Sequence, residues 1–260
     1  MYYVQLLRLR KAFTWFAAIV GAIFLIVLAV LHYPHANVDV SGVNGTIPLS
    51  VVFLGSSLFA IIFATVCGRS LNQENQRPEM VWTKPISRER LALLYMLCDL
   101  AAIAAAFVYA LALILITLAS VGGLTIIKAD AAAPASVCLG LGVAMMWNGE
   151  LQGLTSWQIG RGGLIVGLSW AVFAWLLPAC TALSALWNPA VHAAFVGINY
   201  LDPLAYLATG DGGHVHIGEG SATVQQSFLQ LGLWTRAAIT WSIGIAGWAV
   251  AIFAWKRLEV

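Results

Sequence analysis

Two acidic side chains lie in or beside apolar stretches of this sequence that are long enough to cross a membrane. Asp99 precedes one such stretch, and Glu150 lies inside another together with Asn148 and Gln152. A charge near the middle of a bilayer is costly, so such residues usually face a cavity or a partner. Two interpretations stay open. Either both acids are water-accessible near one membrane interface, or Glu150 and its two amide neighbours line a vestibule or bond a neighbouring helix.

Histidines and cysteines are the other residues that could do chemistry. The five histidines are His32, His35, His192, His214 and His216. His214 and His216 flank one residue in a glycine-rich stretch, and imidazole suits zinc and copper. No cysteine or close carboxylate completes a ligand set, so surface histidines are favoured and we predict no metal site. The four cysteines lie in or beside apolar runs, which indicates buried thiols: Cys67, Cys98, Cys138 and Cys180.

Catalytic motifs are absent from the sequence. It contains no G-x-S-x-G, H-E-x-x-H or C-x-x-C pattern. A P-loop is excluded too, because the chain has no Gly-Lys dipeptide. We therefore predict no catalytic residue and no cofactor on this chain.

The composition is that of a protein embedded in a membrane. Apolar residues make up 61% of the 260 residues and charged residues 9%, and the mean hydropathy is +0.87. About 20 apolar residues cross a bilayer as a helix. We predict an all-α, polytopic fold, with one transmembrane domain over residues 1–260 and an interfacial lead-in at 1–12. The six expected spans are residues 13–31, 47–67, 100–121, 132–157, 164–186 and 233–255.

The distribution of basic residues predicts the orientation of these spans. Cytoplasmic loops of membrane proteins carry an excess of Lys and Arg. With six spans, eleven basic residues fall on one side and only Lys128 and Arg236 on the other. Both termini are therefore predicted to be cytoplasmic. The net charge of +2 does not indicate a nucleic-acid partner.

Residues 69–90 form the most charged segment, and they join the second and third spans. Within it, Glu79, Met80, Val81 and Trp82 form an amphipathic piece too short to be a stable helix alone. It could dock into a partner protein, or lie among the lipid headgroups with Trp82 as its anchor. Ser87 can cap the helix that follows.

This segment resembles the coupling loop of type-2 ABC exporter permeases. Glu79 matches the Glu of that loop, and Pro85, Ser87 and Arg88 match its Pro-x-Ser-Arg. The Gly-Thr pair of the family is absent, and Gln76 and Arg77 stand there instead. The resemblance implies that the residues contacting the ATPase are Glu79, Met80, Val81, Trp82, Pro85, Ser87 and Arg88.

The resemblance also implies partners and a location. It predicts a multi-pass permease of a cell membrane, most simply a bacterial inner membrane, paired with a second permease subunit. Separate cytoplasmic ATPase chains would bind ATP and Mg²⁺, so this chain is not itself expected to be an enzyme. Asn148, Glu150 and Gln152 would then lie along the substrate path. The resemblance does not select the exported substrate.

Two other functions stay open on the sequence. One is an integral membrane enzyme acting on lipid-linked substrates, with Asp99, Glu150 or the outer histidines as acid and base. The other is a membrane subunit that handles a metal cofactor through His214 and His216. The missing motifs argue against the enzyme.

The long connection at residues 187–230 should contain short outer helices between the fifth and sixth spans. Pro189 and Pro203 bracket its first part, which is too polar for an independent span and too apolar for a free loop. We expect one or two short helices that dip into the outer leaflet, with Phe195 and Tyr200 as candidate plugging residues of an outer gate. A single long surface helix is the competing view. A short surface helix at 221–230 is also expected.

Tryptophans recur every seven residues in the last span. They are Trp234, Trp241, Trp248 and Trp255. Heptad spacing keeps them on one face. A lipid-facing stripe is the favoured interpretation, and an aromatic wall that contacts substrate is the alternative.

The charge distribution generates a testable topology. A cysteine introduced by Gly212→Cys should react with a membrane-impermeant maleimide added outside intact cells. One introduced by Asn75→Cys should react only after the inner face is exposed, and the wild-type chain measures background from the native cysteines. Labelling of both positions from the same side would contradict six spans.

Overall fold

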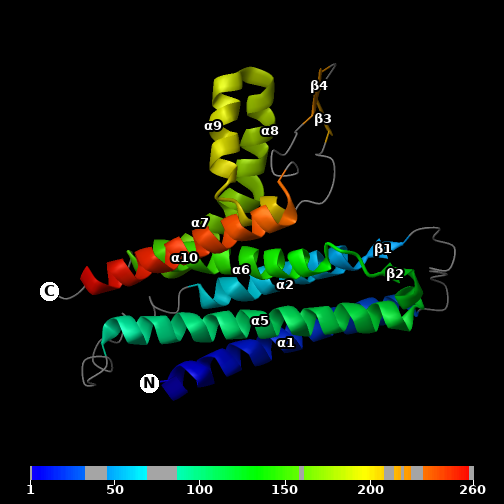
Figure 1. Ribbon diagram of the computed structural model, residues 1–260, viewed down its shortest axis with the longest axis horizontal. Coiled ribbons are helices and arrows are strands. Elements are labelled where there is room, and N and C mark those ends of the chain that lie inside the picture. Colours follow the sequence, from blue (N-terminus) through cyan, green and yellow to red (C-terminus); the bar gives the residue numbers. More distant parts are fainter. Residues whose placement is uncertain are drawn as a thin grey trace.

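The structure of the protein is a computed structural model that describes residues 2–32, 46–68, 87–157, 161–207, 214–217, 220–223 and 231–257. Helices dominate the described part of the chain. Helices α1, α2, α5, α6 and α10 run alongside one another, and the hairpin of α8 and α9 stands away from them (Figure 1). The long helices are α1 (Tyr2–Leu31), α2 (Leu49–Cys67), α5 (Arg88–Ser120), α6 (Ala133–Ser156) and α10 (Leu233–Arg257).

The remaining elements are short. Between α6 and α10 the chain forms α7 (Gly162–Ala171), the π-helical segment η3 (Val172–Leu176), α8 (Leu177–Trp187), α9 (Pro189–Asn199) and the 3-10 helix η4 (Pro203–Leu207). A 3-10 turn, η2 (Gly123–Ile126), follows α5. Two small β-ladders complete the described part: β1 (Ile47–Pro48) pairs in parallel with β2 (Ile127–Lys128), and β3 (His214–Ile217) pairs antiparallel with β4 (Gly220–Thr223).

Five helical stretches in the described residues are long and apolar enough to cross a membrane. They are Leu6–Leu31, Leu49–Cys67, Glu89–Ser120, Gly162–Ser184 and Leu233–Trp255. Each overlaps an expected span, although the stretches at 6–31 and 89–120 begin earlier than expected. The chain is therefore an all-α protein of the multi-pass membrane type. The expected span at 132–157 forms α6, but α6 is not among these five.

Helix α6 lies at the centre of the bundle and packs mainly against α10 and α2. Most of its residues are buried, including the polar Ser136, Asn148, Gln152 and Thr155. Its moderate apolarity has a simple explanation, because neighbouring helices rather than lipid surround it.

Glycines allow α6 and α10 to approach at backbone distance. A Cβ atom added at Gly149 would collide with the backbone carbonyl of Gly244, and one added at Gly247 would collide with the backbone of Gly149. Small residues at helix contacts favour close packing in membranes, where no hydrophobic effect drives helices together. The seam between these two helices therefore depends on the absence of side chains.

Aromatic side chains join α1 to α2 and α5. The Phe16 and Phe63 rings lie 5.1 Å apart in an edge-to-face arrangement, and the Phe13 ring lies 5.8 Å from Phe63. The hydroxyl group of Tyr109 donates a hydrogen bond of 2.9 Å to the carbonyl oxygen of Ala17. This last contact holds α1 and α5 together near their midpoints.

Asp130 ties the chain after α5 to the start of α2. Its carboxylate accepts hydrogen bonds from the backbone N–H of Ser50 at 3.2 Å and from the Ser50 hydroxyl at 2.5 Å. The first helical N–H groups lack partners within a helix, so this carboxylate from another segment serves as the cap of α2. The β1–β2 pair lies beside the same contact.

The fifth span is not straight, as the position of Pro178 predicts. The helix passes through the π segment η3 immediately before Pro178, and α8 then leaves the bundle (Figure 1). Asn188 caps α9, because its side chain accepts a 2.8 Å hydrogen bond from the N–H of Ala190. The first part of the connection at 187–230 thus contains two short helices, which begin at Pro189 and Pro203. A single long helix is excluded there.

Three expectations differ from the structure. The lead-in at 1–12 is continuous with the first span, because α1 runs unbroken from Tyr2 to Leu31. The residues before position 100 likewise belong to one helix, α5, which begins at Arg88. The helix expected at 221–230 is wrong for its first three residues, which form part of β4, and the others lie outside the described residues.

The glycine seam can be tested by adding one methyl group. Gly149→Ala would force the α6 and α10 backbones apart, so it should lower the free energy of unfolding by about 1–3 kcal/mol. Thermal unfolding of the detergent-solubilised protein measures the effect. Gly55→Ala is the matched control, because no atom lies within 4 Å of its added Cβ. Equal melting temperatures for the two variants would contradict the seam.

Candidate functional site

The polar face of α6 is used for bonds between helices. Asn148 has no exposed surface, and its side-chain oxygen accepts a 2.9 Å hydrogen bond from Trp248 Nε1 on α10. Its amide nitrogen lies 3.5 Å from the carbonyl oxygen of Ala64 on α2. Asn148 therefore joins α6 to both of its main neighbours.

Gln152, one turn further along α6, makes the corresponding bonds nearer the helix end. Its amide nitrogen donates to the carbonyl oxygen of Cys67 at 2.9 Å and to Asp99 Oδ2 on α5 at 3.1 Å. Asp99 is fully buried, so its interpretation as a water-accessible acid is wrong. For Asn148 and Gln152, the expectation that they bond neighbouring helices is confirmed.

Glu150 points to a different side of α6, because it is two residues from both amides on a helix of 3.6 residues per turn. Its residue surface is partly exposed, but both carboxylate oxygens are buried and have no hydrogen-bond partner among the described residues. Buried carboxylates normally have partners. Glu150 is therefore the member of the predicted trio that no helix contact explains.

The turn between α9 and α10 approaches this side of α6. Helix η4 packs against α6, and Tyr206 within it is completely buried. Burial raises the pKa of the Tyr206 hydroxyl, and neighbouring acidic groups, Glu150 and Asp202 among them, add to the shift. Glu150, Asp202 and Tyr206 thus form one cluster although the first is about fifty positions away in the sequence.

Local hydrogen bonds shape this turn. Asp202 Oδ1 accepts from the backbone N–H of Leu204 at 2.9 Å, the geometry of an Asp that precedes a helical turn. The Tyr206 hydroxyl donates to the carbonyl oxygen of Tyr200 at 3.0 Å. From α10, Arg236 donates to the carbonyl oxygens of Tyr206 at 3.4 Å and Leu231 at 3.0 Å. Arg236 is therefore buried at the start of α10 rather than exposed on an outer loop.

A cavity of about 190 Å³ lies beside this turn. Asp202 and Asn199 line it from one side, and Phe173, Pro178 and Thr181 line it from the fifth span. The side-chain oxygen of Asn199 is buried without a hydrogen-bond partner among the described residues. The cavity thus combines apolar walls with polar atoms that can accept hydrogen bonds.

Burial raises the pKa of Asp202 to about 6, and hydrogen bonds from the N–H groups of Leu204 and Ala205 oppose the shift. The folded state therefore disfavours the ionised carboxylate.

An aromatic cluster lies next to the cavity, and sequence reasoning did not single it out. Trp147 Nε1 and Trp170 Nε1 both donate to the hydroxyl oxygen of Thr65, at 2.9 and 3.1 Å. Trp147 also contacts the Phe173 ring, at 5.7 Å between centroids. The sequence did contain a signal for this cluster: Trp147 and Trp170 both lie within expected spans, and the indole N–H of a buried Trp needs a hydrogen-bond acceptor.

The tryptophan stripe of α10 does not face lipid as expected. Trp248 and Trp255 are buried, and Trp241 Nε1 donates to the carbonyl oxygen of Cys138 at 3.1 Å. Only Trp234 is mostly exposed, at 63%. The physical reason is the glycine seam, which brings this face of α10 against α6.

The other predicted site residues are not gathered in one place. Phe195 lies on α9 and Tyr200 directly follows that helix, and both are partly buried. Tyr200 packs against the main core. Of the coupling residues, Glu79, Met80, Val81, Trp82 and Pro85 lie outside the described residues. Ser87 is the N-cap residue of α5 but makes no side-chain capping bond, and Arg88 begins the helix.

The remaining candidates contribute no site within the described part of the chain. No group of three or more His, Cys, Asp or Glu residues there could hold a metal ion. His214 and His216 lie on β3, opposite Thr223 and Ser221 of β4. None of the four cysteines forms a disulfide; Cys67 and Cys98 are buried as expected, whereas Cys138 and Cys180 are only partly buried.

The shifted carboxyl group leads to a pH prediction. A folded-state pKa near 6, raised from 3.8, means that Asp202 favours folding when protonated, and this contribution is lost as the pH rises from about 4 to 6. Asp202→Asn keeps an acceptor for the Leu204 N–H but cannot ionise. At pH 7 it should be more stable than the wild type by up to about 3 kcal/mol.

Thermal unfolding between pH 4 and pH 7 checks this prediction. The wild type should lose stability across that interval relative to Asp202→Asn, whereas Glu89→Gln, which removes an exposed carboxylate on α5, should follow the wild type. Parallel curves for the wild type and Asp202→Asn would show that Asp202 is not responsible.

Comparison with known proteins identifies no relative. No protein-family model, no curated protein and no solved structure matches the chain. The function must therefore be inferred from the residues and their arrangement.

Proposed function

We propose that the chain is the transmembrane permease subunit of a type-2 ABC exporter. In this proposal it pairs with a second permease subunit, identical or different, and separate ATPase chains bind ATP and Mg²⁺ on the cytoplasmic side. The chain itself supplies the substrate path and no ATPase chemistry. The membrane would be a cell membrane, most simply the inner membrane of a bacterium.

The observation that carries the proposal is the location of the charged segment relative to the bundle. Helix α2 ends and α5 begins at the same end of the molecule as both chain termini (Figure 1). The intervening residues include Glu79 and the Pro85-x-Ser87-Arg88 sequence that resembles the coupling loop. A cytoplasmic ATPase would then meet this segment at one end of the transmembrane helices.

Helix α6 supports a count of six spans. Its 24 residues correspond to about 36 Å at 1.5 Å per residue, enough to cross a bilayer. Polar residues are tolerated inside a membrane protein when other helices satisfy them. Asn148 and Gln152 meet this condition, so α6 can cross the membrane despite its lower apolarity.

Within the proposed permease, Glu150 is the best path residue of the trio. Asn148 and Gln152 use their polar atoms to join helices, whereas the Glu150 oxygens have no partner among the described residues. The turn at Asp202 and Tyr206 lies next to Glu150, and α9 leads into this turn. Movement of the α8–α9 hairpin would thus change access to Glu150, with Tyr200 at its base and Phe195 on α9 as gate residues.

The α8–α9 hairpin also offers a surface for the second permease. Leu183 on α8 and Val191 on α9 are exposed, and so is Trp175 in η3 just before the hairpin, at 78%. Large apolar side chains on a projecting element suit a subunit interface or lipid. The proposed dimer would cover part of this surface.

The coupling role is tested by two single substitutions. Glu79→Ala and Arg88→Ala should leave the permease inserted in the membrane but reduce its co-purification with an ATPase chain or the ATPase stimulation by several-fold. The measurements are pull-down from native membranes, with identification of any chain that carries a P-loop, and ATP hydrolysis of the complex.

Arg161→Ala is the matched control. It removes an exposed arginine next to α7, in a loop also predicted to be cytoplasmic, but outside the coupling segment. Unchanged assembly and turnover in both coupling variants, or an equal loss in the control, would refute the coupling assignment.

A further inference from the structure

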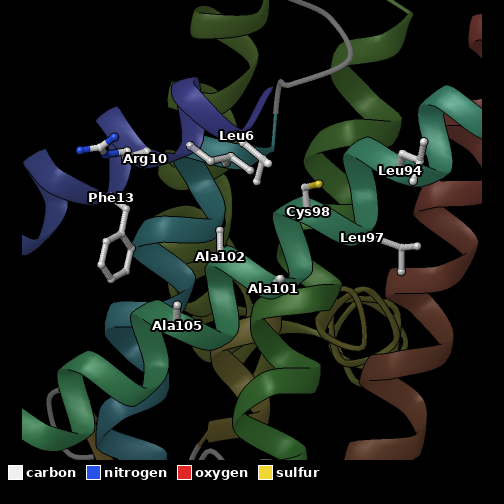
Figure 2. Close-up of a pocket in the computed structure, with 10 residues that line it drawn as sticks. Leu6, Arg10, Phe13, Leu94, Leu97, Cys98, Ala101, Ala102 and Ala105 are labelled. Atoms are coloured by element: carbon white, nitrogen blue, oxygen red, sulfur yellow. The ribbon is translucent and has the colours of Figure 1, made fainter. Parts of the chain in front are cut away.

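A groove of about 500 Å³ lies between α1 and α5 at their N-terminal halves. The lining residues come from α1, among them Leu6 and Phe13, and from α5, among them Ala101; the Arg10 side chain extends from α1 away from α5 (Figure 2). Apart from Arg10, the residues that line the groove are apolar or carry a thiol. The groove belongs neither to the α6 cluster nor to the coupling segment.

Small side chains on α5 create this groove. Three of the lining residues are alanines, Ala101, Ala102 and Ala105, and they leave space opposite α1. Further along, Tyr109 bonds to Ala17 and brings the two helices into contact. This contact bounds the groove toward the middle of the bundle.

The length of the groove suits an extended acyl chain that reaches about halfway across a bilayer. From Leu94 to Ala105 the lining of α5 covers eleven residue steps, or about 16 Å. The length is about half of the 30 Å hydrocarbon core of a bilayer, the depth of one leaflet.

A lipid tail is the apolar chain that a membrane supplies at this depth. Burial of the tail alone does not select a lipid, because the surrounding tails are equally apolar. Selection must come from the headgroup. Arg10 is exposed at the edge of the groove, and its planar guanidinium group can donate two hydrogen bonds to a phosphate.

A second cation lies in line with the groove on α5. Arg90 precedes Leu94 by four residues, so helical spacing places it one turn before the lining residues on the same face. Arg90 is exposed. Basic groups between transmembrane helices on the cytoplasmic side are a known arrangement for anionic lipid headgroups.

We propose that this groove binds one anionic glycerophospholipid from the leaflet at the N-terminal ends of α1 and α5. One acyl chain lies along Leu97 and Ala101, and the phosphate accepts hydrogen bonds from Arg10. The lipid fills the space between α1 and α5 and so fixes their separation. This site requires only that the chain lies in a membrane, and it is independent of the proposed export function.

Native mass spectrometry of the full-length protein in detergent tests the site with two probes, a phosphatidylglycerol and a phosphatidylcholine with the same acyl chains. The wild type should retain one phosphatidylglycerol and prefer it several-fold over phosphatidylcholine. Arg10→Gln should weaken phosphatidylglycerol binding about fivefold and leave phosphatidylcholine unchanged. Lys11→Gln, the adjacent exposed cation that does not line the groove, should have less than a twofold effect.

The tail position needs a separate pair of variants. Ala101→Leu fills the groove and should weaken binding of both lipids, whereas Ala112→Leu, an exposed alanine further along α5, should not. Circular dichroism and size-exclusion profiles confirm that each variant is folded. Equal wild-type affinity for the two lipids, equal effects of the two cation variants, or unchanged binding in Ala101→Leu would each overturn the proposal.

Discussion

The structure depends on one constraint, the need to satisfy buried polar groups without water. A membrane offers no hydrogen bonds to such groups, so each must find a partner within the protein. Helix α6 meets this requirement by placing Asn148 and Gln152 where α2, α5 and α10 provide donors and acceptors. The glycines of α6 and α10 are part of the same solution, because only close backbones bring Trp248 within reach of Asn148.

Helix positions were largely predictable from the sequence, whereas the faces of the helices were not. An apolar run such as 233–255 identifies a span because its length matches the bilayer. The seven-residue spacing of Trp241 and Trp248 correctly places them on one face, but spacing alone does not say what that face meets. The decisive factor is Gly244, whose backbone lies directly against Gly149 on α6. This contact places the face of α10 that carries the tryptophans against α6.

The outer segment shows the same limit in a different way. Pro189 and Pro203 were expected to bracket one or two short helices, and in the structure a short helix begins at each, because proline suits the first turn of a helix. The return of η4 to the core could not be predicted, since it depends on a contact between Tyr206 and α6 across a long stretch of sequence. No local pattern marks Tyr206 as a core residue, although Asp202 before Pro203 is a recognisable turn signal.

The two sides of α6 differ in a way that bears on motion. On the side of Asn148, three long helices surround α6 and are joined to it by hydrogen bonds between side chains and backbone. On the side of Glu150, the neighbour is η4, a turn of five residues that connects to a hairpin standing away from the bundle. A short element with few neighbours moves at lower cost than a packed helix. A conformational change that opens the protein near Glu150 would therefore displace η4 and the α8–α9 hairpin while the contacts of Asn148 and Gln152 stay intact.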